Sequence, residues 1–212
     1  MINDYADQRM FSADNARTLP PAAGEERVVF MGDSITIGWG RTGSPNFFPG
    51  RPYINRGISG QVTSQMLLRF YPDVILLKPK AVVILAGTND IGNNIGPVPD
   101  ESIQNNLAAM ADMAKANGIK VIFSSVTPVC DVPNRAPQTQ LRPPERINTL
   151  NRFLKEYAAK NGLIYLDYFS AMSNEKGLLK PELTADGLHF NAGGYAIMAP
   201  LAEKAISQAL HN

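Results

Sequence analysis

Residues 28–34 read VVFMGDS, an uninterrupted apolar run that ends in a glycine and two polar residues. Two similar apolar runs stand further along the chain, AVVILA at 81–86 and VIFSSV at 121–126. Strands of a parallel sheet covered by helices on both faces read as continuous apolar runs, whereas strands with one wet face alternate. The sequence therefore predicts a buried parallel sheet.

Strand and helix signals alternate along the chain. The expected strands lie at 27–31, 52–55, 81–86, 120–124 and 163–166. The expected helices lie between and after them, at 62–70, 101–116, 144–160 and 192–209. Five such strand–helix units favour a doubly wound α/β sandwich with right-handed crossovers. Long loops are expected at 39–51 and 128–143.

Length and composition set the size of the core. A chain of 212 residues, 44% of them hydrophobic, should bury roughly 70% of its unfolded surface. That is enough for one core and too little for two. We expect a single domain over 1–212, with an N-terminal helix and a proline-containing linker at 1–24 and the core at 25–212.

Charge and hydropathy exclude several classes of protein. The 20 Lys and Arg residues are balanced by 19 Asp and Glu, for a net charge of +1. This balance argues against a nucleic-acid binder or a polybasic membrane surface. The run at 81–86 is too short to span a bilayer, so no membrane span is expected.

Cysteine content and the first residues bear on the cellular compartment. Cys130 is the single cysteine, so no internal disulfide and no thiolate-rich metal cluster can form. The first eleven residues show no basic start followed by an apolar stretch, so no signal peptide is predicted. The sequence leaves localisation open between the cytoplasm and an exported site, and it carries no signal of oligomeric state.

In a doubly wound fold, ligands bind beyond the carboxyl ends of the strands, so the residues after each strand matter most. The first predicted strand runs into Gly32-Asp33-Ser34. Ser34 falls where a helix begins, and the free N–H groups there favour negative charge. A nucleophilic hydroxyl needs that environment, because attack on a carbonyl creates an oxyanion. The alternative is that Asp33 or Ser34 only caps the helix.

Two further strand ends carry potential hydrogen-bond donors. GISG at 57–60 follows the second strand, and Gly60 would let its backbone N–H approach a ligand. GTND at 87–90 follows the third strand, and Asn89 could aim its amide into the same crevice. The alternative for both segments is an ordinary turn, in which Asn and Asp bond their own backbone.

The segment DGLH at 186–189 offers a carboxylate and an imidazole. A spacing of three residues lets one turn bring Asp186 and His189 together, so that the carboxylate can orient the ring. The only other histidine, His211, is next to the last residue. The alternative is a polar turn before the last helix, with Asn191 as its cap.

Taken together, the four segments supply a nucleophile, a base, an orienting carboxylate and an oxyanion hole. In order and content they resemble the four sequence blocks of the SGNH hydrolase, or GDSL esterase/lipase, family, with GDSI here in place of GDSL. The resemblance implies a flavodoxin-like three-layer α/β/α sandwich with a five-stranded parallel sheet, and a serine ester hydrolase. It implies Ser34, Asp186 and His189 as the catalytic triad. It further implies Ser34, Gly60 and Asn89 as the oxyanion hole.

Other interpretations of these residues fit the sequence less well. A nucleotide- or flavin-binding module would need a phosphate loop, and GDSITIGWG at 32–40 matches neither common pattern. An inactive carbohydrate-binding protein would be expected to lack a triad member. A Cys130–His189 hydrolase is disfavoured because a lone cysteine is more often a buried apolar residue. No metal and no cofactor is expected.

The expected partner is a small-molecule or carbohydrate ester with a short, acetyl-like acyl group. The loops at 91–100 and 128–143 are polar and rich in proline, and would bury little of a long acyl chain. A lysophospholipase, a thioesterase or an acyltransferase using the same site is the alternative. Trp39, Phe47 and Phe48 either offer a face to a sugar or aryl group or pack beneath their own loop.

Overall fold

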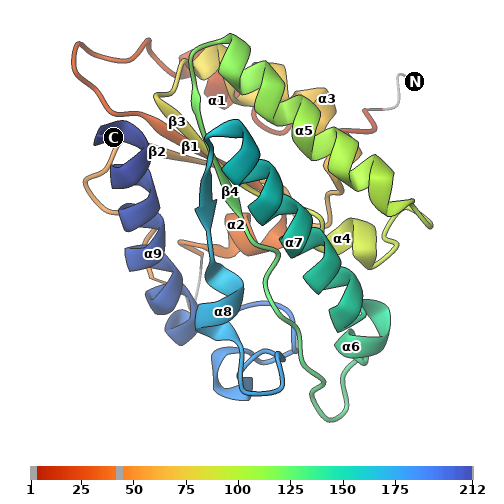
Figure 1. Ribbon diagram of the computed structural model, residues 1–212. Coiled ribbons are helices and arrows are strands. Elements are labelled where there is room, and N and C mark those ends of the chain that lie inside the picture. The colour runs from red at the N-terminus through yellow and green to blue at the C-terminus, as the bar shows by residue number, and fades with distance from the viewer. Residues whose placement is uncertain (1–3, 42–44, 212) are drawn as a thin grey trace.

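A computed structural model describes residues 4–41 and 45–211, and a single parallel sheet forms its centre (Figure 1). The strands run in the spatial order β2-β1-β3-β4-β5, and every neighbouring pair is parallel. Their bounds are β1 Val28–Gly32, β2 Tyr53–Gly57, β3 Ala81–Leu85, β4 Lys120–Ser124 and β5 Ile164–Leu166. This is the strand order of a flavodoxin-like sheet, the fold that the family resemblance implied.

Helices connect the strands and cover both faces of the sheet. The α-helices are α1 Ser12–Arg17, α2 Ser34–Gly38, α3 Thr63–Asp73, α4 Thr88–Ile91, α5 Asp100–Ala116, α6 Gln138–Leu141, α7 Pro144–Asn161, α8 Tyr168–Met172 and α9 Ala192–His211, with 3₁₀ turns at Ile75–Leu77 and Pro181–Leu183. The four predicted helices match α3, α5, α7 and α9 to within three residues at each end. The short α6 lies in the segment predicted as a loop, because one helical turn leaves no periodicity to detect.

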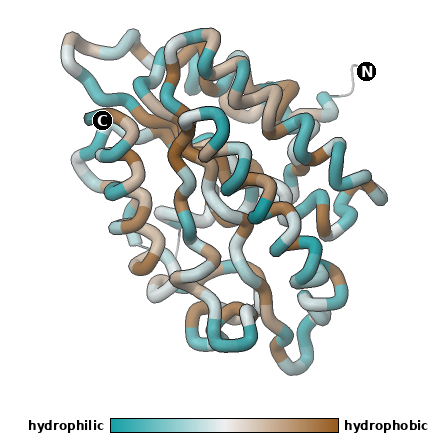
Figure 2. The backbone as a smooth tube through the Cα atoms, in the orientation of Figure 1, coloured by the Kyte–Doolittle hydropathy of each residue, from teal (hydrophilic) through white to brown (hydrophobic). Residues whose placement is uncertain are grey.

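Alternation along the strands divides the core into two halves. Val29, Met31 and Phe123 pack against α3, α5 and α7, whereas Val28 and Phe30 pack against α2, α8 and α9. Both faces are therefore dry, which explains why the strands read as continuous apolar runs. Figure 1 shows α9 on one side of the strands and α5 and α7 on the other, and Figure 2 shows hydrophobic residues concentrated along the strands between them.

An aromatic cluster lies beneath the loop that follows α2. Trp39 is 4% exposed and Phe48 is 7% exposed, and both rings pack on Phe30. Phe47 is half-buried against the same ring. Of the two expectations for these aromatic residues, packing beneath the loop is therefore correct for Trp39 and Phe48. Residues 42–44 of this loop lie outside the described part of the chain.

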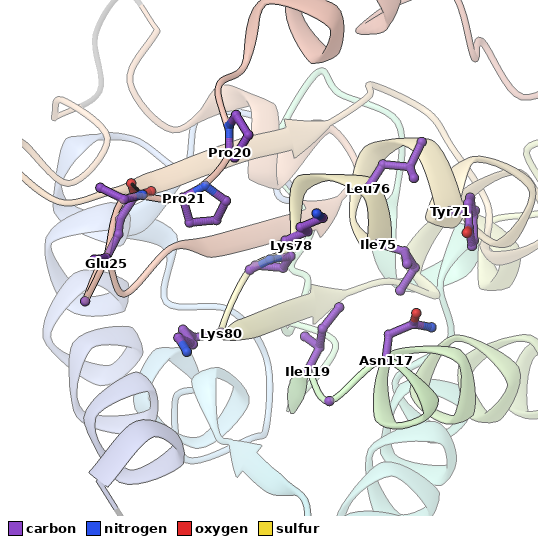
Figure 3. Close-up of a pocket in the computed structure, with 15 residues that line it drawn as sticks. Pro20, Pro21, Glu25, Tyr71, Ile75, Leu76, Lys78, Lys80, Asn117 and Ile119 are labelled. Carbon is purple, nitrogen blue, oxygen red and sulfur yellow. Dashed lines mark hydrogen bonds between the residues drawn. The ribbon is translucent and has the colours of Figure 1, made fainter.

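The amino edge of the sheet carries an open groove of about 770 Å³ (Figure 3). The proline linker forms one side of it, and Tyr71, Leu76 and Lys78 line it further along the chain. It lies at the ends of the strands opposite to the predicted site. Within residues 4–41 and 45–211, no helix is long and apolar enough to cross a membrane.

Candidate active site

The predicted site residues gather at the carboxyl edge of the sheet. Within the sheet, β2 lies on one side of β1 and β3 lies on the other, so the strand order reverses its direction at β1. The edge between β1 and β3 is therefore the topological switch point, where open α/β sheets bind their ligands. Ser34 follows β1 and Asn89 follows β3, so the two residues flank this point, and Gly60 comes after the adjacent β2.

Ser34 is the first residue of α2, and its neighbours hold it there. The Oδ1 atom of Asp33 accepts a hydrogen bond of 2.9 Å from the N–H of Ile35, so Asp33 is the helix cap. Tyr195 in α9 donates its hydroxyl to the Ile35 carbonyl at 2.8 Å. The cap foreseen in the sequence is thus Asp33, and this leaves the Ser34 hydroxyl for another partner.

Gly32 makes the sharp exit from β1 possible. A Cβ atom at this position would lie 2.0 Å from Oγ1 of Thr36 and 2.9 Å from the Leu85 carbonyl oxygen. No larger residue fits there without moving α2 or β3. The glycine of the first motif therefore sets the position of Ser34 relative to the sheet.

A short turn joins Asp186 to His189. Oδ2 of Asp186 lies 2.7 Å from Nδ1 of His189, and Oδ1 accepts the backbone N–H groups of Leu188 and His189 at 3.0 and 2.8 Å. Burial alone would raise the pKa of Asp186, but the hydrogen bonds from the His189 ring and backbone lower it to about 2. Asp186 is consequently an anion at neutral pH and fixes the orientation of the ring.

The same imidazole reaches Ser34 from the other side. Nε2 of His189 lies 2.9 Å from Oγ of Ser34, so both ring nitrogens have a partner. The side chain of His189 is 45% exposed and that of Asp186 is 37% exposed. The three residues thus form a continuous hydrogen-bonded chain that is open to solvent.

Gly60 and Asn89 lie on the neighbouring turns. Gly60 has φ +79°, a conformation that favours glycine, and Asn94 donates its side-chain amide to the Gly60 carbonyl at 3.2 Å. Asn89 is 2% exposed, and its Nδ2 donates to the Gln61 carbonyl at 3.0 Å. An amide nitrogen has two hydrogens, so one remains for a ligand.

Comparison with known proteins identifies the family of the chain. Residues 30–197 match the model of the GDSL-like lipase/acylhydrolase family. The chain belongs to this family. A GDSL-like lipase crystal structure from Bacteroides thetaiotaomicron is 43% identical to it, with a TM-score of 0.89 over 97% of this chain and 100% of that one.

Two curated relatives widen this comparison. The isoamyl acetate-hydrolyzing esterase of Schizosaccharomyces pombe is 29% identical over 81% of this chain and 71% of its own length. The lipoprotein YqeF of Bacillus subtilis is 33% identical over 37% of this chain, and the match spans only 33% of YqeF. With the family match, these findings identify the chain as a serine ester hydrolase of the GDSL type.

A second carboxyl group, that of Asp33, is buried beside Ser34. Asp33 is fully buried, and its Oδ2 has no hydrogen-bond partner among the described residues. Burial raises the pKa of Asp33 to about 6, although the Ile35 N–H and the charges of His189 and Arg142 favour the anion. The carboxyl group beside Ser34 is therefore much less acidic than an exposed aspartate.

The structure also bears on the helix cap, the cysteine and the metal site considered from the sequence. Asn191 does cap α9, accepting the N–H groups of Gly193 and Gly194, while Asp186 and His189 pair with each other. Cys130 is buried, and burial raises the pKa of its thiol. Among the described residues, no group of three or more His, Cys, Asp or Glu side chains is placed to hold a metal ion.

Two contacts at this edge had no signal in the sequence. Both carboxylate oxygens of Asp90 accept the backbone N–H of Thr63, which ties the third motif to the start of α3. Arg142 reaches Asn89 from the loop after β4, which the sequence predicted only as irregular. A single sequence carries no periodicity or spacing that would pair such distant residues.

Proposed function

We propose that this chain hydrolyses short-chain, acetyl-like esters through an acyl-enzyme formed on Ser34. The observation that carries the proposal is the hydrogen-bonded chain from Asp186 through His189 to Ser34, with separations of 2.7 and 2.9 Å. Both distances lie within the range for a nucleophile and its general base. Asp186, His189 and Ser34 thereby have the roles of orienting carboxylate, base and nucleophile.

In the first half of the reaction, Ser34 Oγ attacks the ester carbonyl carbon while its proton passes to Nε2 of His189. Asp186 keeps the other ring nitrogen protonated and stabilises the imidazolium. Collapse of the tetrahedral intermediate breaks the bond to the alcohol, which leaves with the proton held by His189. In the second half a water molecule repeats these steps and releases the acid.

Three donors are proposed to stabilise the oxyanion. The backbone N–H of Ser34 belongs to the first residue of α2, where N–H groups lack intrahelical partners. The N–H of Gly60 and the remaining Nδ2 hydrogen of Asn89 complete the set. Such donors act mainly in the transition state, because the charge they meet develops only there.

The surroundings of Gly60 support a small acyl group. Asn93 and Asn94 are exposed in the loop that follows α4, and Asn94 bonds the Gly60 carbonyl. A long acyl chain along this polar loop would gain little of the ~0.8 kcal/mol available per buried CH₂. The S. pombe relative is named for the hydrolysis of an acetate ester, which is consistent with a short acyl group.

The alcohol part of the substrate is proposed to be polar, with acetylated carbohydrates as one such class. His189 must protonate the departing alcohol, and its 45% exposure leaves that side of the site open to water. Trp39 and Phe48 are packed in the aromatic cluster, so neither provides a stacking face for a sugar.

The experiment is a set of kcat/KM values for acetyl, butyryl, octanoyl and palmitoyl esters of one alcohol, followed by acetyl esters of sugars and of simple alcohols. The proposal predicts the highest value for acetyl or butyryl. A value that rises through octanoyl would contradict it and favour a lysophospholipase or thioesterase. Faster product formation on adding an acceptor alcohol, with a new ester as product, would instead indicate an acyltransferase.

A further inference from the structure

Arg142 is a buried cation behind the oxyanion hole. It follows α6 in the loop between β4 and α7, and it is 6% exposed. Among residues 4–41 and 45–211, no carboxylate forms an ion pair with it. A buried charge without a direct counter-ion is expensive to desolvate, so its retention at this place calls for an explanation.

The guanidinium group holds three acceptors at once. Nε donates to the Thr88 carbonyl at 3.1 Å, and Nη1 donates to Oε1 of Gln138 at 2.7 Å. Nη2 donates to Oδ1 of Asn89 at 3.4 Å. Two of the three contacts are therefore with the start of α4, the segment that carries the side-chain donor of the proposed oxyanion hole.

The contact with Asn89 determines which way the amide faces. Arginine can only donate hydrogen bonds, so the atom of Asn89 that faces it has to be the oxygen. Nδ2 then points the other way, toward the Gln61 carbonyl at 3.0 Å. If the amide were reversed, two donors would face each other at Arg142 and two acceptors at Gln61, and the oxyanion would meet the wrong atom.

The fold also makes room for this guanidinium at Gly92. A Cβ atom on Gly92 would lie 2.9 Å from Nη2 and 3.0 Å from Cζ of Arg142. Burial lowers the pKa of Arg142, while the nearby charges of Asp33 and Asp186 act in the opposite direction. The arginine is thus enclosed within the site on several sides.

We propose that Arg142 is a positioning residue, which orients the Asn89 amide so that its nitrogen faces the oxyanion. The inference rests on the proposed function, because it acts through the role given there to Asn89. Arg142 lies in the loop after β4, outside the four sequence motifs, so this role extends the catalytic machinery beyond them.

The test is a double-mutant cycle between Arg142 and Asn89, measured as kcat and KM on an acetyl ester. Arg142→Met should lower kcat by about 10- to 100-fold and leave KM within about twofold, since a donor that stabilises the transition state is misdirected. In an Asn89→Ala background the same substitution should lower kcat by no more than about twofold. Arg142→Lys keeps the charge but lacks the planar fork, so it should recover little activity.

Arg27 provides a matched control at the other edge of the sheet. It is also buried, at 7% exposure, and also bonds a backbone carbonyl, that of Leu77. Arg27→Met should lower the melting temperature without changing the kcat of the folded protein. If Arg142→Met does not fold, Gly92→Ala provides a second variant, which retains Arg142 and its charge but shifts the guanidinium group. It should then lower kcat by at least about threefold, again only when Asn89 is present.

Three results would overturn the inference, and they are distinguishable. Multiplicative losses in the Arg142→Met/Asn89→Ala protein would show that Arg142 does not act through Asn89, while the proposed function would stand. An Asn89→Ala protein with unchanged kcat would remove Asn89 from the oxyanion hole and contradict both. An unchanged kcat in Arg142→Met or in Gly92→Ala would also overturn the inference.

Discussion

Two buried arginines at opposite edges of the sheet differ in how their charge is balanced. At the amino edge, Arg27 pairs with Glu25 at 2.8 Å and bonds the Leu77 carbonyl. At the carboxyl edge, Arg142 is equally buried without an ion pair to any described residue, and Asp33 keeps an unpaired Oδ2. The groove of about 770 Å³ lies at the amino edge, and Glu25, which pairs with Arg27, is one of the residues that line it. The buried groups without a direct counter-ion, Asp33 and Arg142, lie instead beside the candidate active site, and proteins retain such destabilising groups mainly at functional positions.

The largest effect is expected at Ser34. Ser34→Ala should lower kcat by about 10⁴-fold or more, because it removes the hydroxyl proposed to form the acyl-enzyme. A fluorophosphonate should add its mass to Ser34 in the wild-type protein. Ser64→Ala is the matched control, since the hydroxyl of Ser64 bonds that of Tyr5 at the surface, at 3.3 Å. Labelling of a different serine would show that Ser34 is not the nucleophile, and the carboxyl edge would no longer be the functional one.

Replacing the orienting carboxylate should come next. Asp186→Asn should lower kcat by about 10⁴-fold, because an amide favours the wrong imidazole tautomer. Asp167→Asn is the control: Asp167 also accepts backbone and hydroxyl donors at the start of a helix, and it has no histidine partner there. Activity that depends on an added metal ion after chelation would contradict this role for Asp186.

A smaller loss is expected for the oxyanion donor. Asn89→Ala should lower kcat by about 10²–10³-fold with little change in KM, as for other donors that act in the transition state. Steady-state kinetics on an acetyl ester separates the two constants. A rise in KM alone would mean that Asn89 binds substrate and transition state equally well. Asn89 would then not be an oxyanion donor that acts in the transition state.

Much of this edge could be predicted because each motif directly follows a strand or starts a turn. A strand fixes its last residue in space, so Ser34, Gly60 and Asn89 could be placed at one edge from order alone. Arg142 could not be placed in this way. The path of its loop is set by long-range contacts, such as the hydrogen bond from the Cys130 N–H to the Gly187 carbonyl at 3.0 Å. Such contacts leave no local pattern in the sequence. The sequence likewise leaves open whether Trp39 is exposed or buried, because its burial depends on contacts with Phe30 and Phe48.

Stability should also respond to pH differently at the two edges, and Asp33 should have the larger effect. Its pKa is raised from 3.8 to about 6, so the fold favours the protonated form, and the stability this contributes is lost as pH rises through about 6. Asp33→Asn should not show this loss. The unfolding free energy of the wild type relative to the variant should fall by up to roughly 3 kcal/mol between pH 4 and 7. Denaturant titrations at each pH measure it, and a flat difference would mean that Asp33 titrates normally.

Glu25 at the amino edge should show a weaker dependence of the opposite sign. Hydrogen bonds from the Ala22 N–H and from Arg27 lower the pKa of Glu25 below its usual value, so the fold favours the anion. The stability that this provides is present above the unfolded pKa of about 4.5 and is lost as pH falls through the lower, folded value. From acidic to neutral pH the wild type should therefore gain stability relative to Glu25→Gln, whereas over the same range it should lose stability relative to Asp33→Asn. The effect should be small because Glu25 is only partly shielded from water, which screens its interaction with Arg27. If both pairs diverged in the same direction, the two edges would not differ in how they hold charge, and the contrast between a satisfied edge and a functional one would fail.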